Sequence, residues 1–514
     1  MLICLGCDDL FHEEEISIGK IESVAELESA VDGVWARLAD IFTGEDVVYE
    51  RIFTESSKGD DLSESSATYS YYYGTGNNCS GFSGIQSHSW SMLYSIVISS
   101  NNIITQFNPI EQEKEEIKQL LGEAYLLRAY CLFRLTRTYG RIPLIQDIEI
   151  NYTKPLSSFE EIYSFIESDL QTAMTLLPES NYEARHLYSS PHRGTAKALL
   201  AEVYLSWAGY PVKDETKYAL AAREAGAVVD SAGFFGFSLE EDFAHVWDNT
   251  FRYNPETVLA LFFADPASTD EMTEINTYYF GRYYNYESTL LTRPDSLWML
   301  FWRFATEINF YNRYPKSYRK DITFFTTIYV PRWYYYLQID TGYVYVDVAN
   351  KCARPVFRKF FYSPSLKRRE YENFALNNFY GNSKISLFRY AHALLTYAEA
   401  MARSGQLDAS AYEAVNQIRR RANQVDLFTS SDFDLPAGLS AEAFADSVVQ
   451  ERAWELAGEF EGRWFDLVRL EKVEELEYTR HPDEGGFPQY TVTKEDYFMK
   501  IPEGEQYLNP NLTE

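Results

Sequence analysis

Several features that mark other protein classes are missing from this sequence of 514 residues. It has no uninterrupted run of about 18 apolar residues, so it predicts no membrane-spanning helix. Its five cysteines give no disulfide framework. Cys4 and Cys7 form a lone CxxC pair, but no second cysteine or histidine pair lies near it, so we expect no metal site.

Familiar catalytic motifs are absent as well. The sequence contains no GxSxG nucleophile elbow, no HExxH zinc motif and no phosphate-binding loop with its lysine. The seven histidines are scattered along the chain. These absences exclude the enzymes that such motifs mark. They leave open an enzyme whose two carboxyl groups meet only in the folded structure.

Positive charge is scarce. Lysine and arginine number 46 against 76 aspartates and glutamates, which gives a formal net charge of −30. A surface of this charge repels phosphate backbones, so we expect no nucleic-acid partner. Tyrosine, in contrast, is abundant at 41 residues. Tyrosines fill cores, but they also provide flat amphipathic contact surfaces, and only their local clustering separates the two uses.

The first residues, MLICLGCDDLFHEEE, look like the end of a lipoprotein signal. A short apolar stretch and Gly6 precede Cys7, the residue that would carry the lipid. The pattern departs from a usual signal at Cys4, where leucine is common. We therefore expect residues 1–20 to form a lipoprotein tether attached at Cys7. A plain unstructured N-terminus is the alternative.

Apolar residues at helical spacing predict a mostly α-helical chain. The predicted helices are 21–42, 87–107, 111–139, 158–177, 193–208, 214–231, 393–405 and 411–423. Two helix pairs repeat one pattern, in which a leucine stands ten residues before a glycine: Leu199 and Gly209, then Leu395 and Gly405. This repetition predicts a tetratricopeptide-like scaffold of stacked helix pairs. An irregular helical bundle is the alternative.

The helix predicted at 111–139 is apolar on more than one side. One stripe contains Ile117, Leu120, Leu121, Ala124, Leu127, Cys131 and Leu135, and Leu126, Tyr130 and Phe133 widen it. A stripe of this width needs neighbours on two sides, as an inner helix of a repeat scaffold has. Gly140 can adopt the left-handed conformation that ends a helix, and Pro143 follows shortly after it.

The stretch 232–385, which we call the lobe, lacks long helical periodicity. Aromatic and β-branched residues alternate there instead, which predicts short strands and large loops. The runs that show this pattern are 278–286, 321–339 and 342–348.

The lobe is predicted to be an insertion that divides the helical scaffold into residues 21–231 and 386–514. Within the first part, the polar stretch 43–87 predicts a long loop. We expect residues 55–86 of that loop to lie on the ligand side. Loops carried by a rigid scaffold are where binding residues tend to occur.

Charged residues in the helical segments could suggest a catalytic cluster. They are Arg128, Arg134, Arg137, Glu451, Arg452, Glu455, Arg463 and Asp466. We interpret them instead as members of arginine–carboxylate pairs that fix helix register in the interior. Trp90 and Trp464 lie within helical segments, and we interpret both as core residues.

Seven ordered segments carry a resemblance to a known family. They are WSMLYSIVISSNNII (90–104), EAYLLRAYCLFRLTRTYGRIPLI (123–145), RGTAKALLAEVYLSWAG (193–209), LFRYAHALLTYAEAMARSG (387–405), AVNQIRRRAN (414–423), ERAWELAGEFEGRWFDLVRL (451–470) and IPEGEQYLNPNL (501–512). The chain resembles the SusD/RagB family, the surface glycan-binding lipoproteins of Gram-negative outer membranes. The resemblance covers nearly all of the helical scaffold, but neither the lobe in detail nor the loop 55–86.

The resemblance implies a non-catalytic binding protein without a cofactor, tethered to the outer cell surface by a lipid on Cys7. It also implies a partner, a TonB-dependent barrel transporter of the SusC type, which would receive oligosaccharides or other nutrients. The acidic residues that follow Cys7 are similar to the export tags of surface lipoproteins.

A sugar ligand would need aromatic rings for its C–H faces and a few fixed polar groups for its hydroxyls. Such residues cluster in the loop 69–81 and in the lobe. We predict ligand contacts from Tyr72, Tyr73, Asn77, Asn78, Tyr283, Trp333 and Tyr335. Because side chains alternate between the two faces of a strand, about half of the strand tyrosines should be core instead.

Two other functions stay open on the sequence alone. A helical glycoside hydrolase would use two carboxyl groups set apart in space, and it would release reducing sugar. An intracellular scaffold would bind peptides in the groove of its repeats, and it would carry no lipid.

Overall fold

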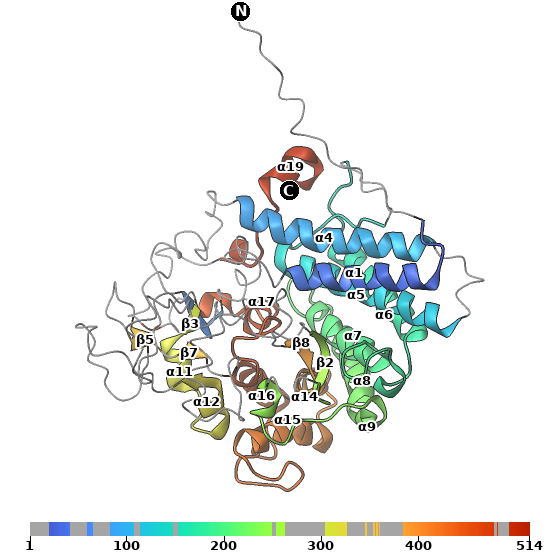
Figure 1. Cartoon of the computed structure of the whole chain (residues 1–514). Coiled ribbons are helices and arrows are strands. Elements are labelled where there is room, and N and C mark those ends of the chain that lie inside the picture. Colours follow the sequence, from blue (N-terminus) through green and yellow to red (C-terminus); the bar gives the residue numbers. More distant parts are fainter. Residues whose placement is uncertain are drawn as a thin grey trace, which may run out of the picture.

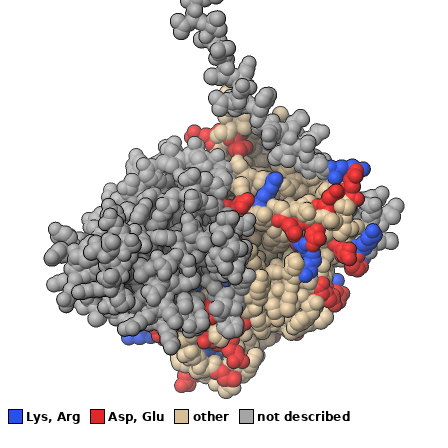
Figure 2. All heavy atoms as spheres, viewed as in Figure 1, with Lys and Arg blue, Asp and Glu red and all other residues tan. Residues whose placement is uncertain are grey.

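A computed structural model describes most of the helical scaffold and parts of the lobe (Figure 1). The described residues are 20–41, 59–64, 83–106, 114–146, 153–248, 253–262, 304–325, 345–346, 353–354, 356–357, 359, 384–476, 481 and 493–513. No helix within these ranges is long and apolar enough to cross a membrane. On the face shown in Figure 2, acidic side chains are scattered over the described part of the surface, with basic ones among them.

The first part of the scaffold is a row of helices, each packed on the next. They are α1 (Val24–Asp40), α4 (Ser83–Gln106), α5 (Glu115–Tyr139), α6 (Phe159–Leu176), α7 (Arg193–Trp207) and α8 (Thr216–Asp230), with a short 3₁₀ turn, η3 (Asn181–Glu183), before α7. Contacts run from α4 to α5, α6, α7 and α8 in turn, and α1 covers α4 and α5. The largest shifts from the predicted bounds are at the starts of α4 and α5, each displaced by four residues.

The second part of the scaffold continues the same row. It consists of α14 (Tyr390–Arg403), α15 (Ala409–Ala422), α16 (Ala441–Glu455) and α17 (Arg463–Arg469). α14 packs against α7 and α8 on one side and against α15 and α16 on the other. The two stretches of repeats, far apart in the sequence, therefore form one body. The predicted mostly helical, tetratricopeptide-like fold is confirmed.

α5 is the innermost helix of the first part. Leu127 and Cys131 are fully buried on one side, and Phe133 is fully buried on the other. α4, α6 and α1 supply the neighbours that the wide apolar stripe requires. The helix ends at Gly140, which has the predicted positive φ of 78°, but its ψ of −124° lies outside the left-handed helical region.

Local capping signals set several helix starts. At α6, the Ser158 hydroxyl accepts a hydrogen bond from the Glu161 N–H at 3.2 Å, and the Glu161 carboxylate accepts one from the Ser158 N–H at 2.8 Å. This reciprocal capping box satisfies two N–H groups that would otherwise lack partners. At α15, the Asp408 carboxylate accepts from the Ser410 and Ala411 N–H groups. The chain therefore enters these helices at the positions its own polar residues define.

Small residues allow elements from the two parts of the scaffold to meet closely. A Cβ atom on Gly209 would lie 2.5 Å from the carbonyl oxygen of Arg469, at the end of α17. The turn after α7 and the end of α17 can touch only because residue 209 has no side chain. Next to this contact, the Tyr210 N–H donates to the same carbonyl at 2.9 Å.

The described part of the lobe consists of short elements. Its helices and turns are α9 (Ala232–Phe235), η4 (His245–Trp247), α11 (Ile308–Arg313) and α12 (Tyr318–Thr323). Its strands are β2 (Thr257–Leu261), β3 (Phe304–Thr306), β4 (Phe324–Phe325), β5 (Tyr345–Val346), β6 (Ala353–Arg354) and β7 (Val356–Phe357), and β8 (Ile385–Arg389) leads from its last residue into the second part of the scaffold. Among them, β2 pairs with β8, β4 with β7 and β5 with β6, all antiparallel.

The run 321–339 does not begin as a strand. Residues 321–323 complete the helix α12, because the Ser317 hydroxyl caps that helix by accepting from the Lys320 N–H at 3.2 Å. The strand β4 starts only at Phe324. Ser317 is therefore the residue that marks the start of this helix, and the aromatic pattern of the run 321–339 gave no indication of it.

The C-terminal segment closes over the first helices. It contains η8 (Val473–Glu475), η9 (Lys494–Asp496), α19 (Glu503–Leu508) and η10 (Pro510–Leu512). The Asn509 side-chain amide donates to the Lys154 carbonyl at 2.7 Å, and that of Asn511 donates to the Thr153 carbonyl at 2.8 Å. The Asn-Pro-Asn-Leu motif thus ties the end of the chain to the connection that precedes α6.

Candidate functional site

All residues predicted to contact ligand lie outside the described ranges. They are Tyr72, Tyr73, Asn77, Asn78, Tyr283, Trp333 and Tyr335. Cys7, the predicted lipid attachment site, also lies outside them. What the structure does describe is the set of residues that flank the aromatic-rich stretches and hold their ends.

The ends of three aromatic-rich stretches lie together. β1 (Leu62–Glu64), which precedes stretch 65–82, pairs antiparallel with β3, which follows stretch 263–303; Glu64 faces Phe304. β4, which precedes stretch 326–344, pairs with β7, and β7 packs against β3. We call β1, β3, β4 and β7 the root cluster; Figure 1 shows β3 and β7 close together on the left. The segments that contain Tyr72, Tyr283 and Trp333 thus start or end at one place.

The strand β1 corrects the prediction that residues 43–87 form a long loop. Its Leu62 is fully buried. A strand of three residues with one buried leucine is too short to show an alternating pattern, and the residues around it are serines and acidic residues. The pairing partner β3, which lies more than 200 positions away in the chain, supplies what the local sequence does not.

Two aspartates fasten β1 to the scaffold. Asp60 forms a two-pronged ion pair with Arg463 of α17, with Oδ1–Nε at 2.6 Å and Oδ2–Nη2 at 3.1 Å. Asp61 accepts a hydrogen bond from the Gly458 N–H through Oδ2 at 2.8 Å. Its backbone carbonyl accepts from the Glu307 N–H at 3.1 Å. The root cluster is thereby anchored to α17 and to the turn before it.

Asp61 is a buried acid with incomplete hydrogen bonding. Its Oδ1 atom has no hydrogen-bond partner among the described residues. Burial raises the pKa of Asp61 to about 6; the charge of Asp60 adds to this shift, while the Gly458 N–H and Arg463 oppose it. The anchor of β1 therefore contains a carboxyl group that changes charge in a mildly acidic range.

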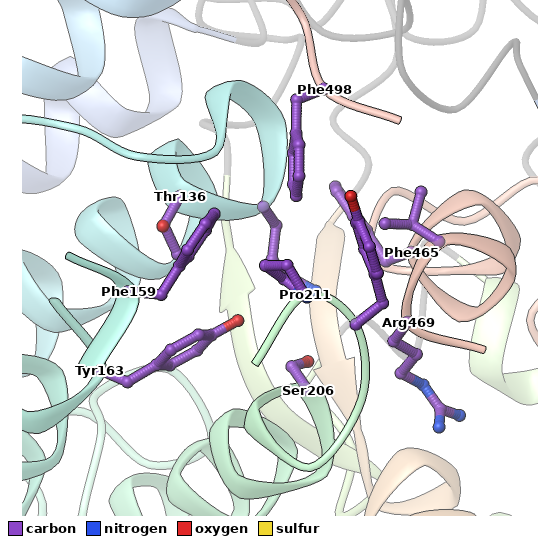
Figure 3. Close-up of a pocket in the computed structure, with 11 residues that line it drawn as sticks. Thr136, Phe159, Tyr163, Ser206, Pro211, Phe465, Arg469 and Phe498 are labelled. Atoms are coloured by element: carbon purple, nitrogen blue, oxygen red, sulfur yellow. The ribbon is translucent and has the colours of Figure 1, made fainter. Parts of the chain in front are cut away.

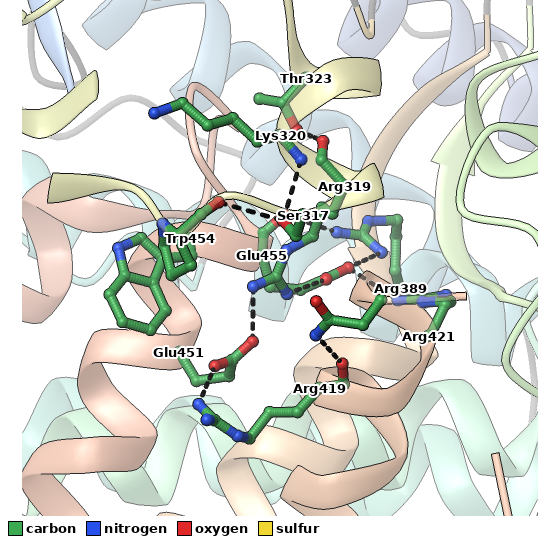
Figure 4. A network of polar contacts seen from close by, with 12 residues as sticks. Ser317, Arg319, Lys320, Thr323, Arg389, Arg419, Arg421, Glu451, Trp454 and Glu455 are labelled. Carbon is green, nitrogen blue, oxygen red and sulfur yellow. Dashed lines mark hydrogen bonds and ion pairs between the residues drawn. The ribbon is translucent and has the colours of Figure 1, made fainter. Parts of the chain in front are cut away.

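A buried network of charges joins the lobe to the scaffold (Figure 4). We call it the junction network; its members are Glu256, Arg319, Lys359, Arg389, Arg421, Glu451, Glu455 and Glu459. Each of these residues is at most 5% exposed. Glu256, Arg319 and Lys359 come from the lobe, Arg389 from the end of β8, and the others from α15, α16 and the turn that follows.

Arg389 is the centre of the junction network. Its Nε and Nη2 atoms donate to the two oxygens of Glu459, both at 2.9 Å. Its Nη1 donates to Glu455 at 3.0 Å and also to Glu256. Because a guanidinium is planar and its N–H groups point in fixed directions, it can donate to three carboxylates in only one arrangement.

Arg319 and Arg421 extend the network from both sides. In Figure 4, Arg319 of α12 reaches between two carboxylates of α16; its ion pairs measure 2.6 Å to Glu451 and 2.8 Å to Glu455. Arg421 of α15 pairs with Glu455 at 2.8 Å and with Glu256. The lobe helix α12 is thus held on α16 by charge.

Glu455 and Glu459 stay ionised at neutral pH, because neighbouring arginines lower the pKa of both carboxyl groups in spite of their burial. Burial by itself would raise the pKa of Glu459, but Arg389 and Lys359 outweigh it and lower the value to about 2. Lys359 donates to Glu459 at 2.7 Å, and burial lowers the pKa of this lysine to about 8 in spite of that carboxylate. A fully engaged, permanently charged carboxylate positions its neighbours and does not exchange protons with a substrate.

The predicted pairing of the helical charges is confirmed. Arg128 binds Asp169 with two hydrogen bonds, at 2.8 and 2.6 Å, and Arg452 binds Asp466 at 3.0 Å and Glu202 at 3.0 Å. The remaining members each have a partner too: Arg134 and Arg137 pair with Glu461, Arg463 with Asp60, and Glu451 and Glu455 with Arg319. Trp90 and Trp464 are buried, as predicted for core residues.

Sequence reasoning missed most of the partners. Asp60, Asp61, Glu256, Lys359 and Arg389 were not singled out, because each is one charge among many and the residue it meets lies far along the chain. Only Arg389 carried a local signal: it stands directly before the helical segment 390–403, at the junction of strand and helix.

One described cavity lies between α5, α6, α17 and the turn after α7 (Figure 3). Thr136, Phe159, Tyr163, Ser206, Pro211, Phe465, Arg469 and Phe498 are among its lining residues. Its volume is about 20 Å³, which suits a water molecule and is far too small for a sugar ring. In the described ranges, no three His, Cys, Asp or Glu side chains are grouped to hold a metal ion.

The geometry defines a class of protein: a helical-repeat body with a lobe that is locked to it by charge and whose aromatic-rich stretches arise at one root. Comparison with known families agrees with this description. Residues 251–514 match the model of the SusD family, and residues 12–205 match a model described as "Starch-binding associating with outer membrane". The chain belongs to the SusD family, and the predicted resemblance is confirmed.

Individual relatives cover all or nearly all of the chain. SusD-like protein P2 of Formosa agariphila is 26% identical over 535 aligned positions, which span 100% of this chain and 96% of the relative. A SusD homolog from Bacteroides thetaiotaomicron has a TM-score of 0.71 at 23% identity, over 96% of this chain and 97% of its own. A structure solved with a xylogluco-oligosaccharide has a TM-score of 0.70 at 21% identity, over 95% and 98%. These structures share the fold.

Proposed function

We propose that this protein binds an oligosaccharide at the cell surface and delivers it to a TonB-dependent outer-membrane transporter of the SusC type. Membership of the SusD family supports this function, as does the match to a model whose description names starch binding and the outer membrane. The xylogluco-oligosaccharide in a structure of the same fold supports a glycan as the ligand.

One observation carries the choice of site. The root cluster gathers the ends of the stretches 65–82, 263–303 and 326–344 and is anchored to α17 through Asp60 and Asp61. Binding residues need a rigid base, because a site that is free to shift loses contacts on binding. Our proposed ligand contacts are Tyr72, Tyr73, Asn77, Asn78, Tyr283, Trp333 and Tyr335.

A binding role agrees better with the described carboxylates than a hydrolase does. A glycoside hydrolase needs two carboxyl groups open to the substrate, one of them protonated near neutral pH. In the junction network the carboxylates of Glu455 and Glu459 are buried and engaged by arginines. We propose that the protein is not an enzyme and requires no cofactor.

The tether is the second part of the proposal. Residues 1–20 would attach the protein to the outer membrane through a lipid on Cys7, with no other membrane contact. Metabolic labelling with a palmitate analogue in the native host should mark the protein, and Cys7→Ala should abolish the label. Labelling that survives this substitution would remove Cys7 from the proposal.

Calorimetry with an oligosaccharide tests the ligand site. Replacing Trp333, Tyr72 and Tyr73 together by Ala should weaken binding by a few kcal/mol, at about 1 kcal/mol or more for each lost stacking contact. That loss turns a micromolar site into one that is barely measurable. The matched control is Tyr507→Ala, which removes an aromatic ring that is 87% exposed on α19 and should leave affinity unchanged.

Two outcomes of this experiment would count against the proposal. Unchanged affinity in the triple variant, with helicity intact by circular dichroism, would move the site away from these residues. Shorter products that appear during the titration would show that the protein hydrolyses its ligand.

A further inference from the structure

The small cavity of Figure 3 lies where the two parts of the scaffold meet. It is lined by α5, α6 and α7 from the first part, and by α17 and Phe498, which precedes α19, from the second. Among the described residues, its lining includes two arginines and several hydroxyl groups but neither an aspartate nor a glutamate. Arginine and hydroxyl groups donate hydrogen bonds, whereas a carboxylate would repel a negative charge. The lining therefore suits an occupant that is an anion.

Arg137, one of the two arginines of the lining, is a buried cation with unused donors. The residue is 6% exposed. Its Nη2 atom donates to Glu461, but its Nε and Nη1 atoms have no hydrogen-bond partner among the described residues. A buried N–H group without an acceptor costs about 1–3 kcal/mol, and more when the group is charged. The cavity beside Arg137 is thus a place where an acceptor would be bound strongly.

Glu461 has little left to offer to these unused donors. One of its oxygens accepts from Arg134 at 2.9 Å and from the Tyr130 hydroxyl at 2.7 Å, and the other accepts from Arg137. Burial alone would raise the pKa of Glu461, but Arg137 and Arg134 lower it to about 2. The carboxylate is therefore ionised at neutral pH, and two guanidinium groups share its single charge.

Two aromatic rings hold the Arg137 guanidinium in place. Its Cζ atom lies 3.8 Å from the centroid of the Phe133 ring and 4.1 Å from that of Phe465. Rings stacked this closely keep water from the faces of the guanidinium, so an acceptor has to approach in its plane, along the N–H bonds. Charges attract more strongly where water is excluded. The donors of Arg137 are therefore fixed before an anion binds.

The other polar groups of the lining have separate roles. Arg469 is fully engaged, since it donates to Glu399 at 2.7 and 2.6 Å and to Asp466 at 2.9 Å. In Figure 3 its guanidinium points away from the other labelled side chains. The Tyr163 hydroxyl points inward, toward Pro211, and Tyr163 and Ser206 both line the cavity. Hydroxyl groups at these positions can donate to the same occupant as Arg137.

Size and hydrogen bonding together select the occupant. A volume of about 20 Å³ admits one water molecule or one ion of similar size. A water molecule has two hydrogens of its own to donate, and the N–H groups of Arg137 cannot accept them. A chloride ion is only slightly larger than a water molecule, and it accepts hydrogen bonds without donating any.

We propose that this cavity is a binding site for one chloride ion, held by the unpartnered N–H groups of Arg137 and by the hydroxyl groups of Tyr163 and Ser206. The ion would link α5, α6 and α7 to α17 and so stabilise the contact between the two parts of the scaffold. This site is separate from the proposed glycan site, and it does not depend on the proposed function.

Bromide locates the ion directly, because it replaces chloride and scatters X-rays anomalously. Crystals of the full chain prepared in sodium bromide should show an anomalous peak in the cavity, in contact with Arg137. In solution, sodium chloride should stabilise the protein when it replaces sodium gluconate, whose anion is too large for the cavity, at constant ionic strength. Urea is the denaturant, because guanidinium chloride would supply the ion. At about ten times the dissociation constant of chloride, the unfolding equilibrium constant should be about tenfold lower.

Two variants assign the effect to the cavity. Arg137→Lys keeps a cation for Glu461 but removes the planar donors, and it should abolish the bromide peak and the chloride dependence. Tyr163→Phe is the milder variant and should weaken chloride binding severalfold while the protein stays folded. The matched control is Tyr204→Phe, which removes a tyrosine hydroxyl that donates to Glu167 at 2.5 Å, outside the cavity lining, and should keep the full chloride dependence.

Three results would overturn the proposal. Density in the cavity without an anomalous signal, together with equal stability in chloride and gluconate, would show that the occupant is water. A bromide peak without any chloride dependence in solution would show an adventitious ion only. Stabilisation by chloride that is the same in the wild type, in Arg137→Lys and in Tyr163→Phe would be a general effect of the salt and not of this site.

Discussion

The interior of the scaffold and the junction with the lobe are equally buried but are held by different chemistry. Around α5, the side chains that meet are apolar, such as Leu127 and Phe133, and neither is exposed. At the junction, Arg389 and Glu455 are equally buried, and both are charged. Burial alone therefore does not say how an interface works. The kind of side chain decides what the interface can tolerate.

Apolar packing and buried charge impose different constraints. Leucines and phenylalanines need the right volume, and neighbouring helices can adjust to small changes. A buried guanidinium needs each of its carboxylates in one place, and a missing partner leaves an uncompensated charge. The junction network thus fixes one orientation of the lobe on α15 and α16. A repeat scaffold supplies a stable body, and the charged junction sets the position of what the body carries.

The largest effect should come from placing a charge in the apolar interior. Leu127→Asp puts a carboxylate without a partner among the helices around α5, and we expect it to destabilise the protein by about 5 kcal/mol or more. Chemical denaturation followed by circular dichroism measures the loss. The control is Ser164→Asp on the exposed face of α6, which adds the same charge in water and should change stability by less than about 0.5 kcal/mol. Equal stability of the two variants would show that this stripe of α5 is not core.

The next largest effect should come from removing the centre of the junction network. Arg389→Met keeps most of the side-chain volume but leaves Glu256, Glu455 and Glu459 with one cation fewer. Breaking a buried ion pair in this way costs about 3–5 kcal/mol, and thermal and chemical unfolding should both show it. Leu127→Ala, which only creates a cavity in the scaffold, should lower the free energy of unfolding by a similar amount, about 2–5 kcal/mol. Measuring both variants compares the apolar interior with the charged junction directly.

The control for that experiment is an ion pair whose arginine is exposed and whose buried carboxylate, Glu224, keeps a second cationic partner in Lys197 at 2.8 Å. Arg223 pairs with Glu224 at 2.7 Å, but its side chain is 61% exposed. Arg223→Met should therefore cost less than about 1 kcal/mol. If Arg389→Met destabilised the protein as little as Arg223→Met, the buried charges would contribute no more to stability than surface charges do. The contrast between the two interfaces would then be wrong.

The scaffold was predictable because its signals are local. The apolar spacing in α5, the Leu-to-Gly spacing in the repeats and Ser158 at the start of α6 each act within a few residues. A single sequence therefore contains enough to place these helices, and the misplaced starts of α4 and α5 lie where no capping side chain is evident. The arginines Arg128 and Arg452 were also interpretable, since a charge in an apolar helix face must find a partner.

The root cluster and the junction network could not be derived in the same way. β1 consists of three residues and exists because β3 pairs with it. Glu256 and Arg389 are more than 130 positions apart, and no spacing rule connects them. Non-local contacts of this kind depend on how the scaffold brings distant segments together. They came into view only with the fold, although the aromatic clusters of the lobe had already predicted where ligand binding should be sought.

The smallest effect we predict concerns Asp61, at the anchor of β1. The folded protein raises the pKa of this carboxyl from 3.8 to about 6, mainly through burial, so the folded state holds the proton more tightly than the unfolded chain does. This contribution to stability is fully present below about pH 4 and is lost as the pH rises through 6. A shift of this size corresponds to roughly 2–3 kcal/mol between the two limits.

Asp61→Asn removes the ionisable group and keeps an oxygen that can accept from the Gly458 N–H. Measured by chemical denaturation, its stability relative to the wild type should therefore increase by about 2 kcal/mol between pH 4.5 and pH 7.5. Asp426→Asn is the control of opposite sign: the Thr429 side chain and the Phe428 N–H lower the pKa of this exposed carboxyl, so its loss should not favour the variant at higher pH. If Asp61→Asn gains nothing between the two pH values, then Asp61 ionises freely in the folded protein. The anchor of β1 would then be open to water, and the root cluster would be less firmly fixed than the junction network beside it.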